Sequence, residues 1–141
     1  MATGYCTLYG DMAGGFAVLK DISKTMVYRL CEYRNSLSMV IPKRVIQRAP
    51  SAELRPDQTD QDSLPPYDVI DGIIEAYVEK GESLNEIIDM GYSETDVKHI
   101  VNLICKNEYK RRQSPVGVCV TQHSFIRDWH YPITSKYKNE V

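Results

Sequence analysis

Residues 66–112, PYDVIDGIIEAYVEKGESLNEIIDMGYSETDVKHIVNLICKNEYKRR, decide the fold expected of this chain. Their apolar side chains recur at helical spacing in three successive runs, the pattern of amphipathic helices. Lys80 and Gly81 close the first run, and Gly91 closes the second. The stretch therefore predicts three helices and a chain that is mostly helical.

Polar residues before the second and third runs predict where these helices begin. Ser83 with Glu86 has the pattern of a capping box, in which each side chain accepts a hydrogen bond from the other residue's backbone N–H. Ser93 with Asp96 resembles a second box. We expect the third helix to continue from there to about Arg112.

The chain upstream of this stretch is expected to hold shorter elements. Apolar spacing predicts a helix over about 24–34 with Ser23 as its N-cap, and Pro42 opens a short helical turn through residues 43–47. The first twenty residues lack a helical period and are expected to be a loop or an extended segment. Downstream, residues 116–120 could pair as a short strand, so we expect at most one or two strands in total.

Residues 49–67, APSAELRPDQTDQDSLPPY, are expected to form a long mobile loop. They hold four prolines and almost no large apolar residues, so they bury too little surface to offset the entropy of ordering them. Long loops inside compact domains are often lids over a site, and we favour a lid. A passive linker remains the alternative.

Composition is that of an ordinary globular chain. Its 141 residues suit one domain or part of one, with 43% hydrophobic and 26% charged residues. No apolar run is long enough to span a bilayer, and the first residues do not resemble a signal peptide, so we expect no membrane association. The four cysteines are widely spaced without a CxxC pair, which favours a reducing cytoplasm over a disulfide framework.

Charge is unevenly distributed along the chain. Residues 1–52 hold seven basic and three acidic residues, residues 53–96 hold two and thirteen, and residues 98–141 hold eight and three. Basic ends around an acidic middle suit either an anionic ligand or internal charge pairing. Likewise, Lys106 and the cluster 110–112 either complement a helix dipole or bind phosphate.

Other motifs are weaker. The glycines of residues 10–17 have P-loop spacing, but Phe16 and Ala17 replace its lysine and hydroxyl residue, so a structural turn is the better interpretation. Residues 83–112 have the outline of a nucleic-acid-binding helix-turn-helix, which we keep as the alternative function. Because Glu94 and Asp96 would face DNA phosphates, we expect no nucleic-acid partner. Cys119 and His123 lack a second ligand pair, and we predict neither a metal site nor a catalytic nucleophile.

Four separated motifs carry a resemblance to a known family. They are GYCTLYGDMAGGFAVLKD at residues 4–21, APSAELRPDQTDQDSLPPYD at 49–68, EYKRRQSP at 108–115 and RDWHYPIT at 127–134. Together and in this order they resemble the C-terminal half of the synthetase domain of glutamine-dependent NAD synthetase. The resemblance implies that residues 1–141 are the C-terminal portion of that domain, with loop 49–67 as a substrate lid, a helical segment 66–112 and a tail 113–141.

The resemblance implies a ligase. The family amidates deamido-NAD to NAD: ATP adenylates the nicotinate carboxylate, and ammonia derived from glutamine then displaces AMP. ATP and Mg²⁺ are the implied cofactors of the intact enzyme, with magnesium offsetting phosphate charge. The family fold is α/β, adenine nucleotide alpha hydrolase-like, a parallel sheet flanked by helices, of which this portion would supply mainly helices.

Site residues are carried over by position. Those implied for deamido-NAD binding are Tyr5, Cys6, Thr7, Leu8 and Lys110. Those implied for ATP binding are Lys24 and Ser51, where serine keeps the hydroxyl of a threonine found in smaller relatives. Leu8 and Gly15 depart from a lysine and an aspartate of the ammonia-only enzymes, so substrate contacts of that kind are not assumed there.

Two parts of the family's pattern do not occur in this sequence. They are the SGGxDS-type pyrophosphate loop and the glutaminase domain. The chain therefore resembles a fragment, expected to be inactive alone and to need the N-terminal half of the enzyme as its partner. Helix faces without that half would be exposed, and self-association into a homo-oligomer is expected.

Overall fold

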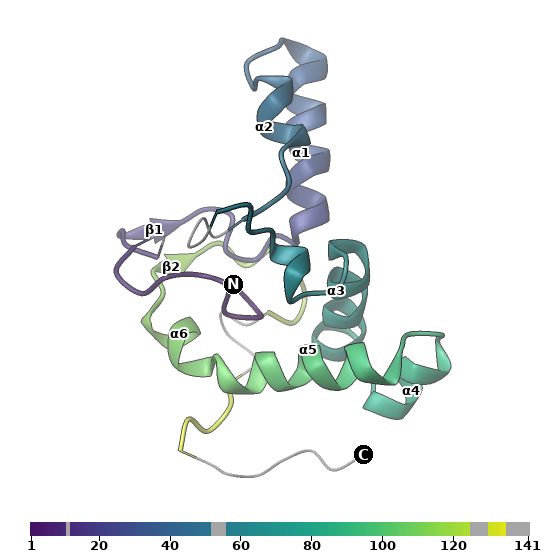
Figure 1. Cartoon of the computed structure of the whole chain (residues 1–141). Coiled ribbons are helices and arrows are strands. Elements are labelled where there is room, and N and C mark those ends of the chain that lie inside the picture. The colour runs from purple at the N-terminus through teal and green to yellow at the C-terminus, as the bar shows by residue number, and fades with distance from the viewer. Residues whose placement is uncertain (11, 52–55, 125–129, 135–141) are drawn as a thin grey trace. The chain divides into compact units, whose positions relative to one another are not determined.

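The computed structural model describes residues 1–10, 12–51, 56–124 and 130–134, which form two compact units. The first unit comprises Met1–Asp21 with Gly72–Val141, and the second unit comprises Ile22–Asp71. Helix α3 (Tyr67–Ile74) crosses from the second unit into the first. Each unit is described in turn below, and its elements can be followed in Figure 1.

Helices build the core of the first unit. After α3 come a π-helical turn (Glu75–Glu79), α4 (Leu84–Asp89), α5 (Glu94–Lys106) and α6 (Glu108–Gln113). Their buried apolar side chains lie at predicted apolar positions, except for Ala76, and are Ile73, Ala76, Tyr77, Val78, Ile87, Val97, Ile100, Val101 and Ile104. The prediction of three helical runs is confirmed, with the first run ending in a wider turn that buries three consecutive residues.

One of the two predicted capping boxes forms. Ser83 Oγ accepts a hydrogen bond from Glu86 N at 3.3 Å, and Glu86 Oε2 accepts one from Ser83 N at 2.7 Å. Ser93 makes no such side-chain bond at the start of α5, so the second predicted box is wrong. Gly81 and Gly91 end their helices with positive φ, as the pattern predicts.

The third helix breaks at Asn107, contrary to the prediction of one helix to about Arg112. The side-chain amide of Asn107 donates to the carbonyl of Leu103 at 2.8 Å. Asparagine side chains that bond nearby backbone groups in this way compete with helix hydrogen bonding. α5 therefore ends at Lys106, and α6 starts as a separate helix at Glu108.

A two-stranded parallel sheet joins the N-terminal segment of the first unit to the segment that follows α6. β1 (Phe16–Ala17) pairs with β2 (Val116–Gly117), Phe16 opposite Val116 and Ala17 opposite Gly117. The predicted strand at 116–120 is thus shorter than expected, and the prediction of a mostly helical portion with one or two short strands is confirmed.

The second unit begins with two helices that are connected by a turn. α1 (Lys24–Leu37) starts at the predicted N-cap Ser23, whose Oγ accepts from Met26 N at 3.3 Å, and runs three residues beyond the predicted end. α2 (Lys43–Gln47) covers the predicted helical turn. The Asn35 side chain bonds the backbone of Val40 and Ile41, and so fixes the turn between these helices.

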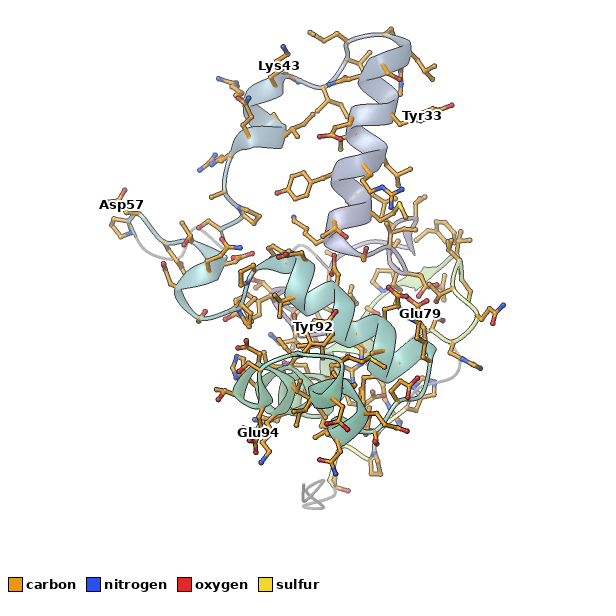
Figure 2. All side chains as sticks on the ribbon, turned by 90° about the vertical axis from the view of Figure 1, so that its right-hand side faces the viewer. Tyr33, Lys43, Asp57, Glu79, Tyr92 and Glu94 are labelled. Atoms are coloured by element: carbon orange, nitrogen blue, oxygen red, sulfur yellow. The ribbon has the colours of Figure 1, made fainter. Side chains whose placement is uncertain are left out.

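α1 has no buried residue. Tyr33 points outward from the helix (Figure 2), and Leu37 and Met39 are equally exposed at its end. Among the described residues, none of the helices combines the length and hydropathy needed to cross a bilayer.

Candidate functional site

Lys110 and residues 4–6 meet in the first unit, although about a hundred residues separate them in sequence. The ammonium of Lys110, on α6, donates to the carbonyl of Gly4 at 2.6 Å and to that of Cys6 at 3.0 Å. An ammonium carries three N–H donors, so these bonds leave one N–H not committed to either carbonyl. Two parts of the sequence-predicted deamido-NAD set are therefore brought together.

Side chains of the segment 5–8 alternate in exposure. Tyr5 is 41% exposed and Thr7 is exposed, whereas Cys6 and Leu8 are half-buried. The Cys6 thiol lies 3.0 Å from the sulfur of buried Met12, which anchors that side of the segment. Tyr5 and Thr7 thus present more of their side chains to solvent than Cys6 and Leu8 do.

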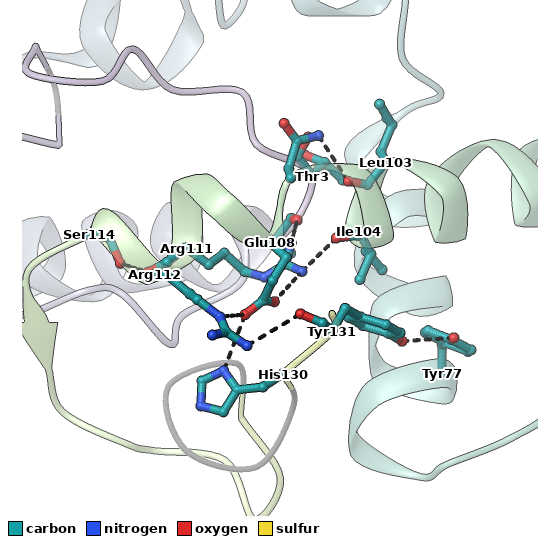
Figure 3. Close-up of polar contacts among 12 residues, drawn as sticks. Thr3, Tyr77, Leu103, Ile104, Glu108, Arg111, Arg112, Ser114, His130 and Tyr131 are labelled. Atoms are coloured by element: carbon teal, nitrogen blue, oxygen red, sulfur yellow. Dashed lines mark hydrogen bonds and ion pairs between the residues drawn. The ribbon is translucent and has the colours of Figure 1, made fainter. Parts of the chain in front are cut away.

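Glu108, at the start of α6, is the centre of an ion-pair cluster (Figure 3). Its Oε2 accepts from Arg111 Nη2 at 2.9 Å, and its Oε1 accepts from Arg112 Nε at 2.8 Å and lies 3.3 Å from His130 Nδ1. Burial would raise the pKa of Glu108, but the hydrogen bonds from Arg112 and Arg111 outweigh it, and the pKa lies below its ordinary value.

This cluster changes the interpretation of the basic run 110–112. Arg111 is buried and donates to the carbonyls of Ala2 and Ile104 besides Glu108, while Arg112 also reaches the carbonyl of Tyr131. These two guanidinium groups therefore neutralise an internal carboxylate. Of the three residues, Lys110 is the one whose bonds in the described part of the chain go to backbone carbonyls alone.

Asn107 and Glu108 are the residues that sequence reasoning missed. For Glu108 a signal existed, because Arg111 and Arg112 lie three and four residues later, the spacing of helical ion pairs. For Asn107 no local pattern distinguishes a helix-breaking asparagine from an exposed one within a helix.

The two predicted ATP-binding residues, Lys24 and Ser51, both belong to the second unit. Lys24 Nζ lies 5.6 Å from the ring centre of Tyr28 and 5.7 Å from that of Tyr67, within cation–π range. The Tyr67 hydroxyl donates to Asp60 at 2.5 Å. Burial, together with the Asp60 carboxylate, raises the pKa of Tyr67.

Loop 49–67 is anchored at both described ends. Asp60 N donates to the carbonyl of Pro50, next to Ser51, at 2.9 Å, and Leu64 is buried. A short 3-10 turn spans Asp60–Asp62, where the Asp62 carboxylate accepts from Thr59 N and Oγ1 at 2.9 Å each. Hence a chain of contacts runs from Lys24 through Tyr67 and Asp60 to the backbone beside Ser51. The segment 52–55 lies outside the described residues.

The remaining residues considered from the sequence, for a metal site or for nucleic-acid binding, do not come together in the described structure. Cys119 and His123 bond different groups, Ser124 and the Glu79 carbonyl respectively. Within the described ranges no three His, Cys, Asp or Glu side chains are arranged to hold a metal ion. Glu94 and Asp96 occupy the first turn of α5, where they would repel nucleic-acid phosphates.

Comparison with known proteins gives a consistent result. A family model described as NAD synthase matches residues 1–114. Two similar curated proteins are named glutamine-dependent NAD(+) synthetase: that of Acinetobacter baylyi is 54% identical over 98% of this chain, and that of Aquifex aeolicus is 54% identical over 96%. The chain spans about a quarter of their length, 26% and 24%.

A solved structure is also similar in sequence. It is the glutamine-dependent NAD+ synthetase of Acinetobacter baumannii in complex with adenosine diphosphate, 48% identical, with 92% of this chain and 22% of that one covered and a TM-score of 0.49.

Proposed function

Because this chain belongs to the NAD synthase family, we propose that it supplies the deamido-NAD-binding segment and part of the ATP site of a glutamine-dependent NAD synthetase. The observation that carries the proposal is the contact of Lys110 with the Gly4 and Cys6 carbonyls, which joins two distant parts of one predicted substrate site. The reaction would be the ATP-dependent amidation of deamido-NAD through an adenylated carboxylate.

In this proposal the first unit binds deamido-NAD. The substrate is anionic, carrying a pyrophosphate and a nicotinate carboxylate. The uncommitted N–H of Lys110 offers it a charge-assisted hydrogen bond. The exposed ring of Tyr5 and hydroxyl of Thr7 offer a stacking face and a polar contact.

The second unit would contribute to ATP binding. Lys24 supplies a positive charge for the triphosphate, and its ammonium is held beside two tyrosine rings. Ser51 supplies a hydroxyl, next to a backbone fixed by Asp60. Magnesium would offset phosphate charge in the intact enzyme.

Two further features belong to the proposal. Loop 49–67 would close over the substrates as a lid, and the exposed apolar side chains of α1, together with Met39, would support self-association into a homo-oligomer. The protein would act in the cytoplasm, in keeping with four cysteines that form no disulfide. Sedimentation as a monomer at micromolar concentration would contradict the homo-oligomer.

Calorimetric titration of the chain with deamido-NAD tests the substrate assignment. We expect saturable binding that weakens about ten- to a hundredfold in Lys110→Ala, the cost of a hydrogen bond from a charged group. Lys106→Ala is the matched control, since Lys106 is an exposed lysine at the end of α5. Equal binding by the wild type and Lys110→Ala would contradict the proposal.

A second assay tests the expectation that the chain is inactive alone. The chain would be incubated with ATP, deamido-NAD and ammonia, and NAD would be measured with an alcohol dehydrogenase. We expect no NAD, because no SGGxDS-type pyrophosphate loop occurs in these 141 residues. Formation of NAD would overturn that expectation.

A further inference from the structure

Side chains of Asn107 and of α6, which follows it, donate to four carbonyls of the N-terminal segment. The acceptors are the carbonyls of residues 2, 3, 4 and 6, spread over only five positions. The bonds are Arg111 Nη1 to Ala2 O at 2.8 Å, Asn107 Nδ2 to Thr3 O at 2.9 Å, and Lys110 Nζ to Gly4 O at 2.6 Å and Cys6 O at 3.0 Å.

Asn107 is the member of this set that bonds both the N-terminal segment and the end of α5 through one side-chain amide. Its amide nitrogen donates both to Thr3 O and to Leu103 O, at 2.9 and 2.8 Å, and so uses both of its N–H bonds. The amide thus ties the N-terminal segment to the last turn of α5. The helix break at this residue is part of the arrangement, since α6 begins directly after it.

Gly4, which has no side chain, leaves the space that the Asn107 amide occupies. A Cβ on Gly4 would lie 2.1 Å from Asn107 Cγ and 2.3 Å from its Oδ1, so the amide packs directly against the glycine backbone. Gly4 has φ +73°, and the Cys6 amide donates to its carbonyl at 2.8 Å to close a tight turn. A side chain at position 4 would break both the turn and the contact.

We propose that Asn107 is a positioning residue for deamido-NAD binding: by holding Thr3 and Gly4 against α6 it sets the backbone of the segment 5–8 before substrate arrives. This inference rests on the proposed function. With the carbonyls of residues 2, 3, 4 and 6 turned to Asn107 and α6, Tyr5 and Thr7 present their side chains to solvent. Preorganisation of this kind raises affinity because the segment is already ordered before binding, so binding loses less conformational entropy.

The test uses the full 141-residue chain with Asn107→Asp, which keeps the shape of the side chain but removes both donors. Amide hydrogen exchange, urea unfolding, and titrations with deamido-NAD and with ATP are measured. Asn102→Asp is the matched control, because Asn102 is an exposed asparagine on α5.

We expect Asn107→Asp to speed exchange at the Gly4 and Cys6 amides and to weaken deamido-NAD binding about tenfold, the effect of losing the hydrogen bond that holds Thr3. ATP affinity should stay unchanged. Asn102→Asp should change none of these. If Asn107→Asp does not fold, Asn107→Ser, which cannot reach both carbonyls, takes its place in every measurement.

Two results would overturn the inference. In the first, the Gly4 and Cys6 amides of Asn107→Asp exchange faster, but the variant binds deamido-NAD as tightly as the wild type does. In the second, deamido-NAD and ATP binding weaken equally and the unfolding free energy falls, which indicates a general structural role. A wild-type chain that binds no deamido-NAD overturns the proposed function instead. The positioning of residues 3 and 4 by Asn107 is then judged by amide exchange alone, and unchanged exchange in Asn107→Asp rejects it.

Discussion

The carboxylate of Glu108 lies 2.9 Å from the guanidinium of Arg111, and these side chains are only 1% and 2% exposed. Removing one partner of a buried pair leaves the other charge uncompensated, so Glu108→Gln should lower the unfolding free energy by about 3–5 kcal/mol. Urea denaturation measures the loss. Glu94→Gln, which breaks the exposed Glu94–Lys98 pair, should cost at most about 0.5 kcal/mol. Similar losses in the two variants would contradict the prediction.

The same carboxylate should make the stability depend on pH. The folded pKa of Glu108 lies below the ordinary 4.5, so its contribution is complete above that pH and is lost as the pH falls through the folded pKa. Glu86 and Glu94 also have lowered pKa values, and wild-type stability will include their effects. The difference in unfolding free energy between the wild type and Glu108→Gln isolates the contribution of Glu108. We expect this difference to shrink as the pH falls from about 5 to about 3, around and below the ordinary pKa of a glutamate. A constant difference would exclude this linkage.

Lys24 should contribute to nucleotide binding through its charge. Lys24→Met keeps a long side chain but removes the ammonium, and we expect ATP to bind about tenfold more weakly to it, measured by titration of the full chain. Arg29→Met is the control, since Arg29 is an exposed cation on the same helix. If both variants bind ATP as the wild type does, Lys24 is not an ATP contact.

The two serine caps should differ in their contribution to stability. Ser83 forms a complete capping box, and Ser83→Ala should cost about 1 kcal/mol of unfolding free energy. Ser93 makes no side-chain cap bond, so Ser93→Ala should cost clearly less. Thermal denaturation of the two single variants compares them directly, and a reversed order would show that the Ser83 box does not stabilise α4.

Gly117 should tolerate no side chain. An added Cβ would lie 2.5 Å from the Ala17 carbonyl and 2.8 Å from Lys20 Cβ, so Gly117→Ala must push the paired strands apart. We expect a loss of about 1–3 kcal/mol, the usual cost of overpacking. Gly15→Ala is the control, because nothing lies within 4 Å of its Cβ. Unchanged denaturation midpoints for both variants would refute the prediction.

Local sequence patterns predicted the features that depend on contacts between residues close in sequence. Ser23 and the Ser83 box were found because a cap depends on residues three positions apart, and the apolar spacing found the core helices for the same reason. The break at Asn107 escaped prediction because the amide that bonds Leu103 there is also held by Thr3, 104 residues away.

The candidate site shows the same division. Lys110 and the segment 5–8 entered through resemblance to a family, while their contact depends on tertiary structure. The burial of Glu108 was likewise hidden, since a glutamate near two arginines on a helix is usually an exposed ion pair. The sequence therefore predicted the residues of the candidate site, and the structure shows which residues they contact.

The pairing of Phe16 with Val116 also dictates an order of events during folding. A contact between residues a hundred positions apart requires closure of a large loop, so it forms late compared with the local helices. During synthesis β1 leaves the ribosome long before α6 and β2 exist. Its partner strand becomes available only after about a hundred further residues have been translated. The strand pair is thus formed after the helices that lie between its two strands in the sequence, although β1 precedes all of them.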